Sequence, residues 1–334
     1  MDIGTHALAS VALVRAIWPR APRIVLPFVI VAGTIADIDA LSVTLGPGAY
    51  LRWHRTYTHS LALSLLFAIF LGITYRLLAA KSLRYQFGTI SLFLAVVFTE
   101  WLHLALDAFQ WEGAALFWPL RNERIALDWL SSLDPWILIL LLLALTLPEL
   151  LRMVSAEIGG KESKSYRRIG AIAGFALLLI YVGARATLHS EATALLEPRT
   201  YGGELPHRVA AFPEPVSLFA WHGIVETENA FHELSVNLAP NTVFDPEKAI
   251  SLYKPEPSAI LEIATNTAEA KEFLTAAQFP RASVERTDSG YRVELRDLRN
   301  AAAGKMRFEV AVLIDFDPSS RIAQKQFVWN SGKN

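Results

Sequence analysis

The chain has 334 residues, of which 53% are hydrophobic and 19% charged, and its formal net charge is −1. This length is enough for two domains of ordinary size, and the balanced charge gives no indication of a nucleic-acid partner. There is no cysteine, which excludes disulfides, thiolate zinc ligands and cysteine nucleophiles but leaves the redox compartment open.

The two halves of the chain differ in composition. Residues 1–189 contain 16 basic and 12 acidic residues, clustered between long apolar runs, whereas residues 190–334 contain 15 and 20 and mix polar with apolar residues. We therefore expect a membrane-embedded helical domain at 1–190, followed by a soluble α+β domain at 200–334.

Six apolar segments predict an α-helical membrane bundle of about six helices. The first two, 3–18 and 24–36, are shorter than the roughly 20 residues that cross a bilayer, so we expect a hairpin packed against longer helices. Such a hairpin returns His6 to the level of Asp37. The other segments are 61–80, 86–108, 133–151 and 169–188.

The loop charges predict an orientation. The turn at Pro19 and the loops at 76–87 and 152–168 contain 11 basic residues, whereas the loops at 46–59 and 110–132 contain 4. By the positive-inside rule the first set is cytoplasmic, which places the C-terminal domain on the outer side, the periplasm of a bacterial inner membrane.

From about residue 201 the pattern changes to short strands with turn signals. Two segments, 257–265 and 267–278, read as helices, and Ser289-Gly290 marks a hairpin turn. The predicted strands are 218–227, 230–238, 282–287, 291–296, 306–316 and 322–329. We expect a small domain with an antiparallel sheet, and a protein partner for this domain is one role open to it.

Ligand-type side chains gather in the membrane half. The stretch 53–60 (WHRTYTHS) places His54 and His59 directly before an apolar run, where unpartnered polar groups are costly. His103 and Asp107 stand four residues apart on one helical face, a spacing that lets an imidazole and a carboxylate hold one ion.

Asp37 and Asp39, two residues apart, do not share a helical face. One is expected to be a direct metal ligand, and the other an outer group or a ligand from an unwound helix end. The metal-ligand set expected from the residues themselves is His6, His59, His103, Asp107 and one of the two aspartates Asp37 and Asp39, all near the outer ends of their helices. Ionisable residues at membrane depth usually mark function, although a lone intramembrane histidine is more often a packing residue.

Three further residues are predicted to be catalytic. Asp39, or alternatively Asp37, serves as general base; His54 is a second ligand or an outer acid; and Arg55 stabilises charge on an anionic substrate. Glu100, one turn before His103, either orients that histidine or is a solvated helix-end carboxylate.

These motifs resemble those of a known protein family. The series His6, ADID at 36–39, HRxxxHS at 54–60 and HxxxD at 103–107 resembles the LexA-binding, inner-membrane-associated metal-dependent hydrolases of bacteria over about the first 190 residues. A more distant similarity is to zinc-dependent phospholipases C, in whose metal cluster His6, Asp37, His59, His103 and Asp107 would fill successive places.

We therefore expect a multi-pass, membrane-bound hydrolase that uses metal-activated water on a phosphoester or lipid headgroup. The cofactor is a divalent metal, one or two ions, with zinc favoured by the mixed imidazole and carboxylate ligands. The alternatives are a transporter with a metal pathway and a non-enzymatic membrane scaffold with a structural metal.

Overall fold

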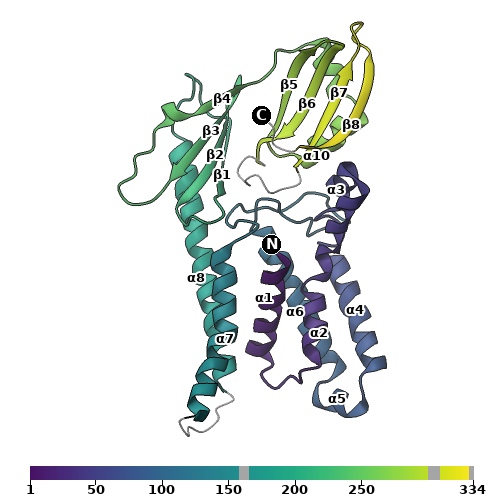
Figure 1. The fold of residues 1–334 in the computed structure, drawn as a ribbon, viewed down its shortest axis with the longest axis vertical. Helices are drawn as coiled ribbons and strands as arrows, with labels where there is room; N and C mark the ends of the chain where they lie inside the picture. The colour runs from purple at the N-terminus through teal and green to yellow at the C-terminus, as the bar shows by residue number, and fades with distance from the viewer. Residues whose placement is uncertain (158–164, 300–308, 331–334) are drawn as a thin grey trace. The chain divides into compact units, whose positions relative to one another are not determined.

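The computed structural model describes residues 1–157, 165–299 and 309–330 (Figure 1). It divides into two compact units: the first comprises Met1–Ala40 and His54–Ala186, and the second comprises Leu41–Trp53 and Thr187–Asn334. The main division lies close to the predicted one near residue 190. Segment 41–53 belongs with the second unit, which no pattern in the sequence indicated.

The first half of the chain is helical, as predicted. The helices are α1 (Ile3–Ile17), α2 (Val25–Ala32), the 3₁₀ helix η1 (Ile35–Leu45), α3 (Pro47–Trp53), α4 (Leu61–Leu78), α5 (Lys81–Gln86), α6 (Thr89–Ala108), α7 (Pro135–Glu157) and α8 (Ser165–Leu196). Of these, η1, α3 and α5 lie wholly or mainly in the predicted loops, and the other six match the six segments that the sequence predicts.

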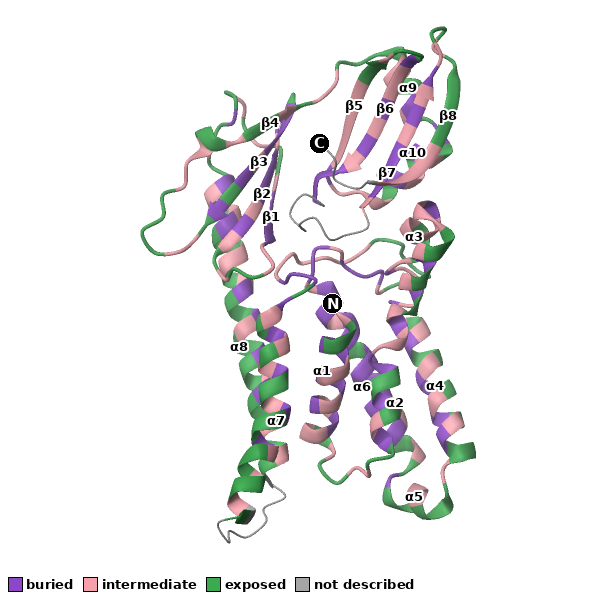
Figure 2. Cartoon of the chain, in the orientation of Figure 1, coloured by how far each residue is buried: buried purple, intermediate pink, exposed green. Residues whose placement is uncertain are grey.

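Four helices in the described part of the chain are long and apolar enough to cross a membrane: Leu61–Leu78, Thr89–Ala108, Pro135–Ser155 and Tyr166–Leu196. A fifth candidate is the pair α2 and η1, which is bent by 48° at a short break. Helix α1, with 15 residues, is shorter than a span. The outer faces of α4, α7 and α8 are rich in exposed apolar residues such as Phe70, Leu143 and Leu179, as expected for contact with lipid (Figure 2).

Local sequence explains the helix ends that matter for the site. The Asp2 carboxylate accepts a hydrogen bond from the Thr5 amide and caps α1, and the Ser60 hydroxyl accepts one from the Leu63 amide and caps α4. Gly33 ends α2. A Cβ at this position would lie 1.8 Å from Ser10 Oγ, so only glycine lets α2 approach α1 this closely.

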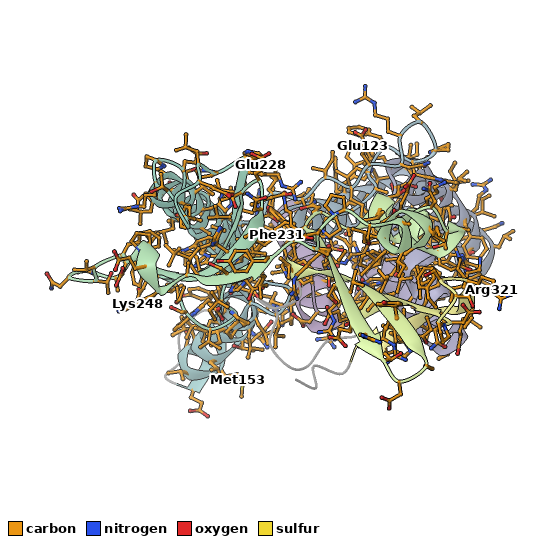
Figure 3. All side chains as sticks on the ribbon, turned by 90° about the horizontal axis from the view of Figure 1, so that it is seen from above. Glu123, Met153, Glu228, Phe231, Lys248 and Arg321 are labelled. Atoms are coloured by element: carbon orange, nitrogen blue, oxygen red, sulfur yellow. The ribbon has the colours of Figure 1, made fainter. Side chains whose placement is uncertain are left out.

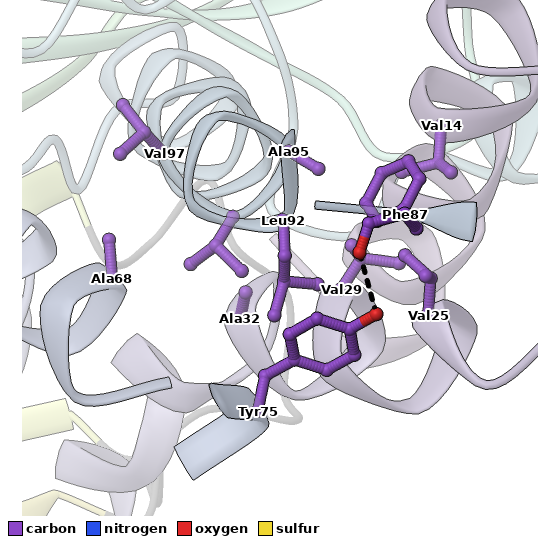
Figure 4. Packing of buried hydrophobic residues seen from close by; sticks show 11 residues of the cluster. Val14, Val25, Val29, Ala32, Ala68, Tyr75, Phe87, Leu92, Ala95 and Val97 are labelled. Atoms are coloured by element: carbon purple, nitrogen blue, oxygen red, sulfur yellow. Dashed lines mark hydrogen bonds between the residues drawn. The ribbon is translucent and has the colours of Figure 1, made fainter. Parts of the chain in front are cut away.

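Two apolar clusters hold the helical unit together. One joins α1, α2, α4 and α6, and within it the Tyr75 hydroxyl donates a hydrogen bond of 2.8 Å to the Phe87 carbonyl (Figure 4). The other joins α1 and α6 to α7 and α8 through residues such as Leu106, Leu141 and Leu178. Helices α1 and α6 contribute to both clusters and are therefore the central elements of this unit.

The second unit contains two four-stranded antiparallel sheets in place of the single expected sheet. One has the order β1-β2-β3-β4 and the other β5-β6-β7-β8, with pairs such as Val225 opposite His232 and Val293 opposite Ile314. The strands are β1 (Arg208–Pro213), β2 (Ala220–Glu226), β3 (Ala230–Asn237), β4 (Ile250–Tyr253), β5 (Pro280–Thr287), β6 (Gly290–Asp297), β7 (Glu309–Phe316) and β8 (Ile322–Asn330). The predicted strand at 306–316 begins in residues 306–308, which lie outside the described residues.

The first sheet escaped prediction as a separate unit because β1 and β4 lack clear strand signals: β1 ends in Pro213, and β4 has only four residues. Helices α9 (Ala259–Thr265) and α10 (Ala268–Ala276) supply apolar residues to the core of the second sheet. Leu51 of α3 packs on the same core, which explains why 41–53 belongs to this unit. Charged side chains such as Lys248 and Arg321 project outward from the unit (Figure 3).

Candidate metal centre

Helix α6 places His103 and Asp107 on one face, as their spacing predicts. His103 Nε2 lies 3.2 Å from Asp107 Oδ2. The other ring nitrogen, Nδ1, lies 2.9 Å from the Gly33 carbonyl. A carbonyl can only accept, so Nδ1 carries the proton and Nε2 keeps its lone pair for a metal. The end of α2 at Gly33 supplies this acceptor.

The ring of His59, just before α4, faces the same two side chains. Its Nε2 lies 3.1 Å from Asp107 Oδ2 and 3.3 Å from His103 Nε2. Its Nδ1 lies 2.9 Å from Asp39 Oδ2, a carboxylate–histidine contact of the kind that orients metal-binding imidazoles. Both histidines therefore present Nε2 to a common centre.

Asp37 completes a set of four ligands. Its Oδ1 lies 3.6 Å from His59 Nε2 and 3.8 Å from His103 Nε2. Tetrahedral ligands at zinc distances are about 3.3–3.4 Å from one another, and the measured separations within this set run from 3.1 to 3.8 Å. We call Asp37, His59, His103 and Asp107 the ligand cage.

His6 of α1 adjoins the ligand cage. Its ring lies against that of His103, with the centroids 3.8 Å apart and the planes tilted by 31°, and its Nε2 lies 3.3 Å from Asp107 Oδ1. Ligand atoms of His6, Asp37, His103 and Asp107 also lie within 4.8 Å of one another, so His6 and His59 complete alternative sets around three shared residues. All five residues predicted as metal ligands are thus brought together.

Several polar atoms at this centre are buried without a hydrogen bond from any described residue. They are both ring nitrogens of His6, Oδ2 of Asp37 and Oδ2 of Asp107. Burying such atoms unpaired is costly, and a divalent cation bound by imidazole and carboxylate removes that cost. The residues present therefore fit a metal ion of the kind the sequence predicts.

Asp39 lies beside the ligand cage and holds the turn at 54–59. Its carboxylate accepts hydrogen bonds from the Arg55 amide at 2.8 Å and the Thr58 hydroxyl at 2.6 Å, in addition to its contact with His59 Nδ1. His54 Nδ1 lies 3.0 Å from its other oxygen. With its oxygens occupied in this way, Asp39 is placed to orient His59.

The other two residues predicted to be catalytic are near the ligand cage but outside it. The His54 ring is 6.4 Å from that of His59, centroid to centroid, and contacts Asp39. Arg55 is 3% exposed, has a positive φ of 57° and lies 3.3 Å from Asp107 Oδ1. Its guanidinium faces Asp107, and the Asp39 bond to its amide supports the left-handed backbone.

Sequence reasoning missed several residues that surround Arg55. Gln110 Oε1 accepts a hydrogen bond of 3.1 Å from the guanidinium, and Glu112 Oε2 lies 3.1 Å from Arg55 Nε. Gln110 also donates to Asp107 Oδ1 at 3.1 Å. Its position three residues after Asp107, near the end of α6, was the signal that could have identified it.

The environment of Glu100 fits neither of the two roles that the sequence suggested for it. It is 4% exposed, so it is not solvated, and His103 Nδ1 is bonded to Gly33, so Glu100 does not orient that ring. Neither carboxylate oxygen of Glu100 has a hydrogen-bond partner within the described part of the chain. It lines a small pocket with Thr58, Ser64 and His103.

The carboxylates around His59 change its protonation. Burial alone lowers the pKa of this imidazole, but the opposing contacts with Asp107, Asp37 and Asp39 raise the pKa to about 10. In the absence of an ion, His59 therefore carries a proton at neutral pH, and a metal must displace it.

Fold and site together define a multi-pass helical membrane protein with a buried histidine–carboxylate centre. Residues 1–192 match the model of the YdjM inner membrane protein family, and the chain belongs to this family. A curated relative, the uncharacterized protein YfhP of Bacillus subtilis (strain 168), is 26% identical over 148 residues, which is 42% of this chain and 43% of that protein. The chain thus matches less than half the length of this relative. No solved structure matches.

Proposed function

We propose that this inner membrane protein is a metal-dependent hydrolase of a phosphoester, such as a lipid headgroup. The observation that supports the proposal is the convergence of His6, His59, His103, Asp37 and Asp107 on one buried point. Zinc is the preferred ion because the ligands combine imidazole with carboxylate. When bound, one or two such ions supply a Lewis acid that lowers the pKa of a water molecule.

Different side chains have different roles in the proposed reaction. His59 and His103 present Nε2 to the ion because Asp39 and Gly33 occupy the opposite ring nitrogens. Asp37 Oδ2, which has no hydrogen bond from the described residues, is the atom placed to accept a proton from the attacking water. Arg55 holds Asp107 in position, and His54 acts through Asp39.

Substrate would enter the ligand cage on the side where Asp37 lies. Its separations from the two histidines are longer than those between the histidines and Asp107, and its side chain is 9% exposed, whereas His59 and Asp107 are fully buried. A catalytic metal needs an open position, and this is where the cage is loosest.

The hydrolase proposal is tested with the full chain purified in detergent. We expect bound zinc in the wild type, hydrolysis of a phosphodiester such as bis(p-nitrophenyl) phosphate or a phospholipid, and loss of both zinc and hydrolysis in His103→Ala. His207→Ala, which changes a histidine of the second unit, serves as the matched control and keeps both. Bound metal without metal-dependent hydrolysis of any phosphoester would refute the enzymatic role.

One observation favours a second candidate, a membrane scaffold with a structural metal. Four protein ligands form a nearly complete shell, and closed four-ligand shells are typical of structural zinc sites. The two candidates differ in solvent access: an exchangeable water on the bound ion, detected by water relaxation with Mn²⁺, supports the hydrolase, and its absence supports the scaffold. In the scaffold role, the C-terminal domain would bind a protein partner.

We also propose that the second unit lies in the periplasm, from the distribution of basic residues among the loops. An alkaline phosphatase fused after Asn334 is then active and a green fluorescent protein at the same place is dark. The opposite pair of results would reverse the orientation.

A further inference from the structure

The two carboxylate oxygens of Asp107 have different surroundings. Oδ2 faces the Nε2 atoms of His59 and His103 at 3.1 and 3.2 Å. Oδ1 accepts a hydrogen bond from the buried N-terminal ammonium of Met1 and one of 3.1 Å from Gln110 Nε2, and it lies 3.3 Å from Arg55 Nη2. A carboxylate that bridges two metal ions gives one oxygen to each, so the contacts of Oδ1 decide whether a second ion can bind here.

Arg55 is held firmly at this oxygen. Its guanidinium also donates to Gln110 Oε1 at 3.1 Å and to the Gly113 carbonyl at 3.4 Å, and its Nε lies 3.1 Å from Glu112 Oε2. Its side chain is only 4% exposed. A guanidinium keeps its charge at all accessible pH values, so a cation is present beside Oδ1 under every condition.

We infer that the centre holds a single divalent ion, bound by the ligand cage through Asp107 Oδ2, and that Arg55, beside the Met1 ammonium, occupies the place of a second cation at Oδ1. This inference rests on the metal site of the proposed function. It reduces the number of bound ions from one or two to one. A second ion would need Oδ1 and the neighbouring His6 Nε2, which lies 3.3 Å from that oxygen. At that position the second ion would be repelled by the positive charge of Arg55 and by the N–H group that Gln110 directs at Oδ1.

The separations in the ligand cage agree with a single site. Those that involve the Nε2 atoms of His59 and His103 lie between 3.1 and 3.8 Å, around the value of about 3.3–3.4 Å for a tetrahedral ion. His6 Nε2 instead lies 3.3 Å from Asp107 Oδ1, the oxygen that faces Arg55 and not the ligand cage. His6 therefore stands next to the place taken by Arg55, as a residue that a second ion would use if that place were vacated.

The first test is the number of ions in the wild-type chain. Purified full-length protein is loaded with Zn²⁺ or Mn²⁺, dialysed, and analysed for metal by mass spectrometry, and the Mn²⁺ form is examined by electron paramagnetic resonance. We expect one ion per chain and the spectrum of an isolated Mn²⁺. Two ions per chain, or a spin-coupled pair, would overturn the inference without any variant.

The second test removes the guanidinium. We expect Arg55→Ala to bind a second ion at Asp107 Oδ1 and His6, so that the count rises from one to two, whereas Arg55→Lys keeps the charge and the count of one. Arg124→Ala, which changes an arginine bonded to the His54 carbonyl at 2.8 Å, is the matched control and keeps one ion. A folded Arg55→Ala protein that still binds one ion would show that Arg55 does not exclude the second.

If Arg55→Ala does not fold, as judged by thermal unfolding in detergent, the double variant Arg55→Lys/His6→Ala replaces it. The inference predicts that this variant keeps one ion, because His6 is no ligand while the positive charge remains. Loss of the ion would overturn it. These counts are independent of hydrolysis: one ion without hydrolysis refutes the proposed function alone, and hydrolysis with two ions refutes this inference alone.

Discussion

Asp107 in the helical unit and Asp297 in the sheet unit are both buried carboxylates, 0% and 5% exposed. Asp297 accepts hydrogen bonds from the amides of Gln278 and Phe279 and from the guanidinium of Arg299 at 2.7 Å. Its oxygens are thus satisfied by its own chain. Asp107 instead turns Oδ2 toward the Nε2 atoms of two histidines.

The difference separates a structural carboxylate from a ligand. A buried carboxylate surrounded by donors is part of the fold, and removing it costs stability. One that faces other ligand-type atoms shares a divalent cation with them once that cation displaces the proton of His59. The predictions below test this distinction, beginning with the largest expected effect.

Replacing the two carboxylates should give opposite results. Asp107→Ala removes a direct ligand, so metal affinity should fall by more than about 100-fold, beyond the range typical of outer partners. Asp297→Ala should keep full metal affinity but lower the unfolding free energy of the sheet unit by about 3–5 kcal/mol, because Arg299 loses a buried partner. Isothermal titration with Zn²⁺ and thermal unfolding measure the two effects. Equal metal affinities in the two variants would remove the distinction.

Metal affinity should rise with pH. The pKa of His59 is raised to about 10, so below that pH an ion must displace its proton. The apparent association constant is then expected to increase about tenfold per pH unit, or roughly 100-fold between pH 7 and 9. Competition with a chelator of known pH dependence measures this slope. His54→Gln, which changes a ring outside the ligand cage, should keep it, and a flat profile in the wild type would contradict the expectation.

Asp39→Asn should weaken the metal site without destroying it. Asp39 orients His59 from 2.9 Å and supports the 54–59 turn, and loss of such an outer partner typically costs about 10–100-fold in metal affinity. The matched control is Asp315→Asn, which loses a contact of 2.7 Å with Arg292 on the sheet and should not change metal binding. If Asp39→Asn binds as tightly as the wild type, the carboxylate does not orient His59.

The smallest effect is expected at Glu100. Its carboxyl group is buried with no hydrogen bond from the described residues, so Glu100→Met should leave metal affinity within about threefold and raise stability by about 1–3 kcal/mol. Thermal unfolding and zinc titration of this variant are the measurements. A large loss of zinc would mean that Glu100 belongs to the metal site.

Much of the centre could be predicted from local sequence because helical spacing alone puts His103 and Asp107 on one face. The apolar lengths likewise predicted the long helices, since α4, α6, α7 and α8 are continuous runs whose composition suits lipid. The family match supports the inner membrane assignment, whereas hydrolase activity and a protein partner for the C-terminal domain remain predictions.

The second unit was harder to predict because sheet partners are distant in sequence. The alternation in β2 and β3 was visible, but whether six predicted strands form one sheet or two depends on pairings that no local pattern specifies. Segment 41–53 shows the same limit. Its attachment to the second sheet depends on contacts of Leu51 and on an ion pair of 3.1 Å between Arg52 and Glu272.

The sequence by itself determined which side chains can bind a metal and which helices carry them, because residue type and helical period are local properties. Only the tertiary structure decided what each group does. It placed Asp37 in the ligand cage and Asp39 behind His59, and it turned Arg55 toward Asp107. These roles depend on which atoms face one another across helices, and that follows from how α1, α2, α4 and α6 pack.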